Sequence, residues 1–191
     1  MRTLNTDLPG VLVIESDVFR DPRGYFLETF HERKYREAGI PHSFVQDNQS
    51  RSTRGTLRGL HAQLRKPQGK LIRALRGEIF DVAVDIRPGS PTFGKWTAAT
   101  LRADDFRQMF IPPGFAHGFC VLSETADVLY KQTAYYDPEV ERGIAWDDPD
   151  IGIEWPLPAD ELIISARDAE APRLRDVADE LPFEFVQEAG P

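Results

Sequence analysis

Cysteine is almost absent from the sequence, and this scarcity excludes two kinds of stabilisation. The 191-residue chain has one cysteine, Cys120, so it has neither an internal disulfide framework nor a zinc site built from several thiolates. No stretch approaches the 18 consecutive apolar residues that a transmembrane helix needs. Residues 1–10 lack a basic segment followed by an apolar one, so no signal peptide is recognisable. These absences favour a cytoplasmic protein.

Positive charge is also scarce, and part of it is concentrated in one segment. The chain has 23 Lys and Arg against 31 Asp and Glu, and its net charge of −8 argues against general nucleic-acid or membrane binding. Residues 51–76 nevertheless contain eight basic residues and no acidic one, so the remaining chain carries −16. This basic segment favours a site for a small anion. The alternative is a solvated basic strand face.

Helical periodicity is sparse, and short strands dominate the prediction. Residues 79–86 alternate, with Val82 and Val84 on one face and Asp81 and Asp85 on the other, which predicts a strand. Further strands are expected at residues 11–16, 24–30, 44–47, 70–75, 96–101, 108–111, 118–122 and 126–133.

Turns rich in Gly and Pro separate these predicted strands. Many short strands joined by such turns indicate a mostly β sandwich or jelly roll, and the length predicts one domain. Only two short helices are expected, at residues 32–38 and 169–180, and Pro172 limits the second. We expect a single domain over residues 1–182 and a C-terminal tail over residues 183–191.

Histidine is rare, and two of the four histidines follow Gly-containing segments. The segment Pro112-x-Gly114-x-x-His117 resembles the second sequence motif of the cupins, which are double-stranded β-helix jelly rolls. The first cupin motif usually supplies two histidines and a glutamate to a metal, whereas the corresponding His61-Ala62-Gln63 has no second histidine. Because a divalent metal needs several matched ligands, we expect a cupin barrel that works without a metal or other cofactor.

A longer series of motifs occurs in order along the chain. The motifs are DPRGYFLE (21–28), FVQDNQS (44–50), LRGLH (57–61), QGKL (68–71), GEIFDVAVD (77–85), SPTFG (90–94), IPPGFAHGF (111–119), LYK (129–131), WDDPDIGIEW (146–155) and SARD (165–168). Together they resemble the dTDP-4-dehydrorhamnose 3,5-epimerase family over roughly residues 5–170. The chain departs from the family pattern at Gln49 and Ala62, two positions expected to line or flank the pocket.

The resemblance implies a metal-free, homodimeric cupin jelly roll that acts on a nucleotide sugar. The expected reaction epimerises C3 and C5 of dTDP-4-keto-6-deoxy-D-glucose through enolates and gives dTDP-4-keto-L-rhamnose for cell-surface polysaccharide. The nearest alternative is a mono-epimerase or ketoisomerase acting on a related dTDP-4-keto-6-deoxy sugar. A metal-dependent cupin enzyme and a non-catalytic sugar-nucleotide-binding cupin are more distant alternatives.

Epimerisation next to a ketone needs a base, a group that stabilises the enolate oxygen, and an acid on the opposite face. His61 fits the base, because a neutral imidazole has a pKa of about 6.5. A carboxylate that fixes its tautomer improves such a base. The resemblance implies Asp168 as that partner, although local sequence alone favours an exposed loop acid there.

Two further residues complete the expected catalytic set. Lys70 lies nine residues after His61, and its ammonium fits the group that faces the enolate oxygen. Its alternative role is a strand-face lysine paired with Glu78 or Asp81. Tyr130 resembles the family's general acid, and neighbouring cations are expected to lower its pKa from about 10. Its alternative role is an ordinary core or rim tyrosine.

The diphosphate of the substrate favours arginine, with Arg58 as first choice and Arg23 as second. The resemblance places Arg23, Phe26 and Glu28 at the nucleotide end, reaching in from the neighbouring subunit of a homodimer. Either Phe26 or Tyr136 is a candidate to stack on thymine, and Tyr136 is alternatively a plain strand residue. The resemblance also implies substrate contacts for Gln46, Asn48, Glu141 and Arg167. His117 is expected in the pocket, where it either hydrogen-bonds the substrate or orients the catalytic groups.

Overall fold

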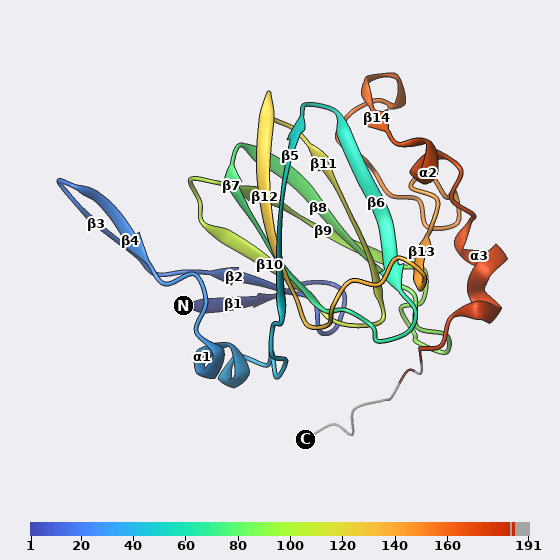
Figure 1. Ribbon diagram of the computed structural model, residues 1–191, viewed down its shortest axis with the longest axis horizontal. Coiled ribbons are helices and arrows are strands. Elements are labelled where there is room, and N and C mark those ends of the chain that lie inside the picture. Colours follow the sequence, from blue (N-terminus) through green and yellow to red (C-terminus); the bar gives the residue numbers. More distant parts are fainter. Residues whose placement is uncertain (184, 186–191) are drawn as a thin grey trace.

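Two sheets of short strands face each other in the computed structural model, which describes residues 1–183 and 185 (Figure 1). The first sheet contains, in spatial order, β1 (Arg2–Asn5), β2 (Leu12–Glu15), β10 (Arg107–Ile111), β7 (Lys70–Arg76), β12 (Thr125–Gln132) and β5 (Gln46–Thr53). The second contains β13 (Glu141–Gly143), β6 (Thr56–Gln63), β11 (Phe115–Val121), β8 (Glu78–Asp85) and β9 (Trp96–Arg102), with β14 (Ile163–Ile164) also paired to β6. This arrangement confirms the predicted mostly β jelly roll.

A two-stranded hairpin stands apart from both sheets. It consists of β3 (Val18–Asp21) and β4 (Gly24–Leu27), and it projects away from the body in Figure 1. Phe19, Tyr25 and Phe26 on this hairpin are exposed.

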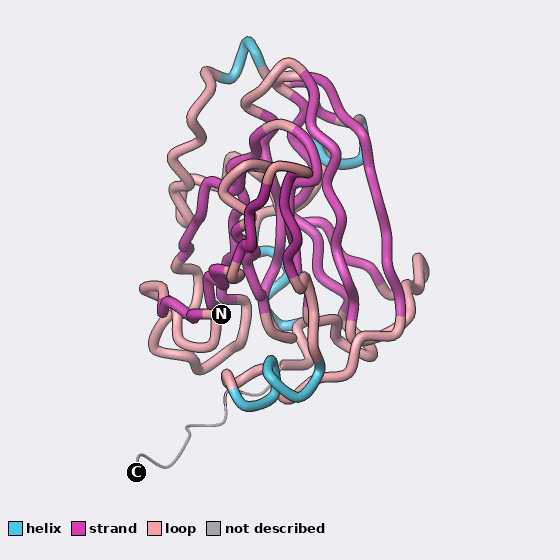
Figure 2. Tube along the Cα trace, turned by 90° about the vertical axis from the view of Figure 1, so that its left-hand side faces the viewer, coloured by secondary structure: helices cyan, strands magenta, loops and turns pink. Residues whose placement is uncertain are grey.

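Helices are few and short, as Figure 2 shows. They are α1 (Glu32–Glu37), η1 (Ala159–Glu161), α2 (Ala166–Ala169), α3 (Leu174–Val177) and η2 (Ala178–Glu180). The helix predicted over residues 169–180 is wrong as one element: Pro172 has no N–H to continue a helix, and the chain divides around it into α2 and α3. Within residues 1–183 and 185, no helix combines the length and apolar character needed to cross a membrane.

The space between the sheets holds the main apolar core, because alternate residues of each strand point inward. Ile72 of β7 and Val128 of β12 in the first sheet pack with Ala83 of β8 and Phe119 of β11 in the second. The predicted alternation of β8 is confirmed, but both faces of the strand are buried. One face points toward the first sheet, and the C-terminal segment covers the face that points away from it.

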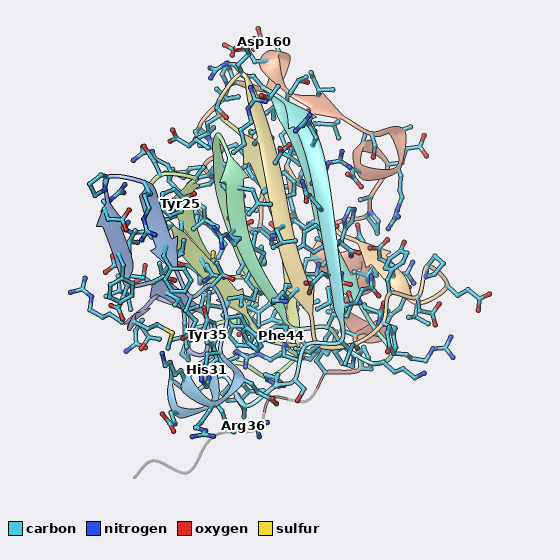
Figure 3. The ribbon with its side chains drawn as sticks, turned by 60° about the vertical axis from the view of Figure 1, so that its left-hand side comes forward. Tyr25, His31, Tyr35, Arg36, Phe44 and Asp160 are labelled. Atoms are coloured by element: carbon cyan, nitrogen blue, oxygen red, sulfur yellow. The ribbon has the colours of Figure 1, made fainter. Side chains whose placement is uncertain are left out.

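The outer faces of the two sheets carry separate clusters. On the second sheet, Val82 and Val84 pack with Leu174 and Val177 of α3. On the first, Leu71 and Phe110 pack with Tyr35 of α1 and Phe44, which Figure 3 shows close together near that helix.

The predicted tail over residues 183–191 begins at a packed residue. Phe183 is buried in the cluster outside the second sheet, and the Phe185 ring centroid lies 5.3 Å from the guanidinium carbon of Arg87. The other residues of the predicted tail, 184 and 186–191, lie outside the described residues.

A one-residue bulge in β6 interrupts its pairing with β11. His61 pairs with His117 and Arg58 with Phe119, so Gly59 and Leu60 together oppose the single residue Gly118. Strict alternation would send Arg58 and His61, three residues apart, to opposite faces, but the extra residue lets both side chains face the interior. Gly59 adopts φ +113°, and a Cβ there would lie 2.6 Å from the carbonyl oxygen of His117.

Substituting Gly59 tests the importance of this bulge. We expect Gly59→Ala to lower the free energy of unfolding by about 1–2 kcal/mol through its positive φ and by about a further 1–3 kcal/mol through steric overlap. The matched control is Gly89→Ala, since Gly89 has φ +82° and no heavy atom within 4 Å of the added Cβ. Urea denaturation of both variants measures the difference, and equal losses of stability would contradict a tightly packed bulge.

Candidate active site

A cavity of about 560 Å³ lies between the two sheets, next to the apolar core. Strands β5, β12 and β7 contribute one wall and β6 and β11 the other, with β13, β14 and α2 at the rim. Ten of the residues predicted from the sequence line it: Asn48, Arg58, His61, Lys70, His117, Tyr130, Tyr136, Glu141, Arg167 and Asp168.

His61 and Asp168 form a hydrogen-bonded pair in this cavity. The Nε2 atom of His61 lies 2.7 Å from Oδ1 of Asp168. The second oxygen, Oδ2, accepts a hydrogen bond of 3.2 Å from the Gly59 backbone N–H, which the bulge of β6 directs toward it. Ser165 caps α2 through its hydroxyl, which accepts from the Asp168 N–H at 3.1 Å. Asp168 is therefore hydrogen-bonded to His61, as the resemblance implied. Its carboxyl is buried, and the exposed loop acid suggested by the local sequence is not observed.

The charge state of Asp168 decides which imidazole nitrogen is basic. Burial alone would raise the pKa of Asp168, but the hydrogen bond and charge of His61, together with the Gly59 N–H, hold the pKa below its usual range. The ionised carboxylate can only accept hydrogen bonds, so Nε2 of His61 carries the proton. Nδ1 then keeps its lone pair and is the nitrogen that can take up a proton.

A second His–Asp pair lies beside the first. His117 occupies the position of β11 paired with His61, and its Nε2 lies 2.7 Å from Oδ1 of the fully buried Asp81. Burial lowers the pKa of His117, although Asp81 opposes this shift, so its imidazole is neutral near pH 7. Among the described residues, no group of three or more His, Cys, Asp or Glu is arranged to hold a metal ion.

Lys70 projects into the cavity from β7 in the opposite wall. Burial lowers its pKa to about 8, although the charges of Glu141 and Asp81 act to raise it. Neither carboxylate suggested by the strand-lysine alternative forms an ion pair with it: Glu78 pairs with Arg102, and Asp81 is bonded to His117.

Tyr130 lies on the same wall, on β12, and packs against the apolar core. The expected lowering by a neighbouring cation is present, since the Arg58 charge acts in that direction, but the net shift of the Tyr130 pKa is upward. Burial raises the pKa of Tyr130 above its usual value, and this outweighs the opposing effects of the Arg58 charge and the Asn48 side chain. The phenol therefore holds its proton firmly.

Polar side chains at the rim are bonded to one another. Arg58 donates through Nε to the hydroxyl of Ser52 at 3.1 Å. The Tyr136 hydroxyl donates to Glu141 at 3.2 Å, and Arg167 forms an ion pair with the same carboxylate.

Gln46 does not line the cavity but is bonded to two residues that do. Its side-chain oxygen accepts from the Tyr136 backbone N–H at 2.9 Å, and its amide nitrogen donates to Asn48 at 3.1 Å. Tyr136 lies in the loop after β12 and is 43% exposed at the cavity edge, so it is not a strand residue.

The structure does not bring Arg23, Phe26 and Glu28 to the cavity of their own chain. Arg23 forms an ion pair with Asp21 on the hairpin, and Glu28, just after the hairpin, pairs with Lys34 at 2.7 Å. Their absence from this cavity has a structural cause, because the hairpin points away from the sheets (Figure 1).

The two departures from the family pattern flank the cavity rather than line it, since each adjoins a lining residue in the chain. Gln49 is an exposed residue of β5 whose neighbour Asn48 faces inward, and Ala62 packs in the cluster outside the second sheet. Of the eight basic residues in segment 51–76, only Arg58 and Lys70 line the cavity. Within the basic segment, therefore, only these two residues can contribute to the predicted small-anion site.

Several cavity residues were missed from the sequence. They are Thr56, Leu57, Gln68, Phe119, Gln132, Ile163, Ile164 and Ser165. Gln132 had a usable signal, because it follows Tyr130 by two residues in a predicted strand and must share its face.

Comparison with known proteins decides what this cavity belongs to. Residues 5–176 match the sequence profile of the family described as dTDP-4-dehydrorhamnose 3,5-epimerase. The chain belongs to this family. The dTDP-4-dehydrorhamnose 3,5-epimerases are isomerases of sugar nucleotides, and their fold is the cupin jelly roll seen here.

Individual relatives of this family resemble the chain along most of its length. The dTDP-4-dehydrorhamnose 3,5-epimerase of Methanothermobacter thermautotrophicus is 55% identical over 92% of this chain and 95% of its own. A solved 3,5-epimerase from Legionella pneumophila in complex with dTDP-4-keto-L-rhamnose is 48% identical, with a TM-score of 0.94 over 97% of this chain and 99% of its own. A 3′-monoepimerase from Streptomyces bikiniensis in complex with dTDP-quinovose is 33% identical, with a TM-score of 0.84 over 92% and 89% of the two chains.

The pH dependence of stability tests the Asp168 pair. Because the folded-state pKa of Asp168 lies below its ordinary value of 3.8, the carboxylate stabilises the folded protein above that pH. This contribution is lost as the pH falls through the lower folded-state pKa. We expect Asp168→Asn to be less stable than the unmodified protein at pH 6, and the difference to shrink between pH 4 and pH 2.5. Urea midpoints across this range measure the difference, and one that does not change with pH would contradict the pair.

Proposed function

We propose that this family member epimerises C3 and C5 of dTDP-4-keto-6-deoxy-D-glucose to give dTDP-4-keto-L-rhamnose. One observation carries the proposal: a His–Asp pair on one wall of the cavity faces a lysine and a tyrosine on the other. Inversion at carbon requires a proton to leave one face of the sugar ring and another to arrive at the opposite face. A base on β6 and an acid on β12, in opposing sheets, meet this requirement.

His61 starts each epimerisation by removing the proton next to the C4 ketone. Its Nδ1 accepts that proton, and the Asp168 carboxylate stabilises the imidazolium that results. The electron pair of the broken C–H bond moves onto the C4 oxygen, where the Lys70 ammonium stabilises the enolate. This stabilisation is strong because the Lys70 ammonium is partly desolvated in the cavity.

Tyr130 completes the step by donating its phenolic proton to the opposite face of the same carbon. Its raised pKa keeps the phenol protonated at neutral pH. The tyrosinate that remains is stabilised by the nearby Arg58 charge, which already acts to lower the pKa of Tyr130. Proton exchange with solvent resets both residues, and the same groups act on the second carbon once the ring has turned.

The rim residues fit the nucleotide half of the substrate. Arg58 is exposed at the cavity mouth and can bind the diphosphate with two parallel hydrogen bonds. Asn48, His117, Glu141 and Arg167 offer donors and acceptors for the sugar and nucleotide, and Gln46 holds Asn48 and the Tyr136 backbone in place. The exposed Tyr136 ring is available to stack on thymine.

The hairpin of β3 and β4 supports a homodimer in which each subunit completes the other's site. Phe26 is 70% exposed on this projecting element, and Arg23 in its turn has an exposed side chain, so both are available to another chain. A second copy is the partner we propose, with Arg23, Phe26 and Glu28 reaching its nucleotide. We place the reaction in the cytoplasm, because a sugar nucleotide with a charged diphosphate does not cross a membrane unaided.

Proton NMR of dTDP-4-keto-6-deoxy-D-glucose with the metal-stripped protein in D₂O tests the reaction. We expect deuterium at both C3 and C5 and a product that the reductase of dTDP-rhamnose synthesis consumes. Deuterium at one carbon would instead assign a mono-epimerase, the activity of the Streptomyces bikiniensis relative. Absence of exchange in the stripped protein, with recovery after metal is added, would overturn the metal-free mechanism.

The same measurement separates the base from the acid. His61→Asn should reduce both deuterium exchange and epimerisation by about 10²–10⁴-fold, because the general base acts first. Tyr130→Phe should reduce epimerisation by a similar factor while exchange continues on the original face, because the base still removes and returns the proton. Equal loss of both rates in Tyr130→Phe would contradict its role as acid.

Mixed dimers test whether the site crosses the subunit boundary. Arg23→Ala should raise KM, since it removes a diphosphate contact, and His61→Asn should abolish turnover. If the hairpin serves the partner's cavity, co-refolding the two variants creates dimers with one intact site, and activity at low substrate recovers to roughly a quarter of that of the unmodified protein. The control is Arg23→Ala mixed with Arg23→Ala/His61→Asn, which restores no intact site. No recovery in the first mixture would contradict a shared site.

A further inference from the structure

Gln132 is a buried amide in the wall of the cavity. It is 3% exposed, and it is the last residue of β12, two positions after Tyr130. Antiparallel pairing of β12 with β7 places it directly opposite Lys70. Both side chains face the cavity, and directly opposed residues have Cβ atoms about 4.5–5.5 Å apart.

Hydrogen-bond donors and acceptors around Lys70 are left without partners. Nothing in the described part of the chain donates a hydrogen bond to the buried side-chain oxygen of Gln132. The Lys70 ammonium has three N–H donors and no ion pair or hydrogen bond with any described residue. Buried acceptors are normally satisfied, because an unsatisfied one keeps its desolvation cost. A short movement of the flexible lysine would satisfy both groups at once.

We propose that Gln132 is a positioning residue for Lys70: its amide oxygen accepts a hydrogen bond from the ammonium and directs the remaining N–H groups toward the cavity. This inference rests on the proposed function for the use made of Lys70, namely stabilising the enolate oxygen. The hydrogen bond itself can be tested without substrate.

A neutral acceptor suits this position better than a charged one. A carboxylate opposite Lys70 would form an ion pair and neutralise the positive charge that stabilises the enolate. An amide orients the ammonium without neutralising its charge. An apolar side chain would leave the ammonium both unoriented and less stable in its buried surroundings. Replacing Gln132 by an apolar residue and replacing it by a carboxylate should therefore shift the pKa of Lys70 in opposite directions.

Other charged or titratable groups also face Lys70, and any test must separate them from Gln132. Asp81 of β8 and Glu141 of β13 favour the ammonium. His117 of β11, His61 of β6 and Tyr130 of β12 share the cavity with it. Substituting Gln132 alone leaves all of these in place.

The test measures the pKa of Lys70 directly in the substrate-free protein. Each lysine is acetylated competitively with limiting acetic anhydride at a series of pH values, and mass spectrometry of its peptide gives the amine pKa. We expect Gln132→Met to lower the pKa of Lys70 and Gln132→Glu to raise it, each by about half a unit to one unit. Lys66 and Lys95, which are exposed, serve as internal references in every sample and should not shift.

Opposite shifts of Lys70 in the two variants support the proposal. A pKa of Lys70 that is unchanged in both, or that moves in the same direction in both, overturns it. If Gln132→Met does not fold, as judged by circular dichroism, Gln132→Leu takes its place as the apolar variant, because a carboxylate at this position raises the pKa of Lys70 by its charge alone. The labelling result does not depend on the reaction, so a protein that lacks 3,5-epimerase activity yet shows opposite shifts would refute the proposed function and leave the Lys70–Gln132 contact standing.

The rate profile then links the contact to catalysis. Because Lys70 acts as an ammonium, kcat/KM should fall as the pH rises through its pKa. The alkaline limb should move to lower pH in Gln132→Met and to higher pH in Gln132→Glu. Labelling shifts without any movement of the limb would overturn the positioning role.

Discussion

The hydrogen bond between His61 and Asp168 connects parts of the chain that are 107 residues apart, and most of the site depends on it. It requires the bulge of β6, which turns His61 inward and aims the Gly59 N–H at the same carboxylate. It also requires Ser165 to cap the short helix that carries Asp168. A small irregularity in a strand and a single helical turn thus determine which imidazole nitrogen is available.

The interior between the sheets is divided between an apolar part and a polar part. Residues such as Ile72, Val128 and Phe119 fill the first part, and His61, Lys70 and Gln132 line the second. Tyr130 belongs to both, since its ring packs against the core while it lines the cavity. Burial explains the shifted pKa values of Lys70 and Tyr130 better than any single neighbouring charge does.

The jelly-roll class was predictable from the sequence because most strands show alternating apolar and polar residues or are flanked by turn residues. The strands that build the site were predicted unevenly: β7 and β12, which carry Lys70 and Tyr130, were expected, but two others were missed wholly or in part. Strand β6, with Arg58 and His61, was not predicted as a strand, and β5 only over its first two residues, because their inward-facing side chains are polar and mimic a loop pattern. Apolar alternation is a weaker signal where a strand presents polar side chains to a cavity.

The chemistry of the site was predictable to a different extent. Residue chemistry and motif resemblance together supplied ten residues that line one cavity, including Asp168, whose local sequence suggests only an exposed acid. The direction of the Tyr130 shift was not predictable, because charge can be counted in a sequence whereas burial depends on the assembled sheets. The location of Gln49 and Ala62 outside the cavity depends in the same way on strand facing.

In the proposed mechanism the base and the acid belong to opposite sheets, so the packing between the sheets becomes part of the stereochemistry. Facing sheets lie about 10 Å apart, and the side chains of the core set that spacing. A larger or smaller residue at Val128, which belongs to the cluster against which Tyr130 packs, would alter the gap between His61 and Tyr130. The width of the site is therefore set in part by apolar side chains that do not line the cavity.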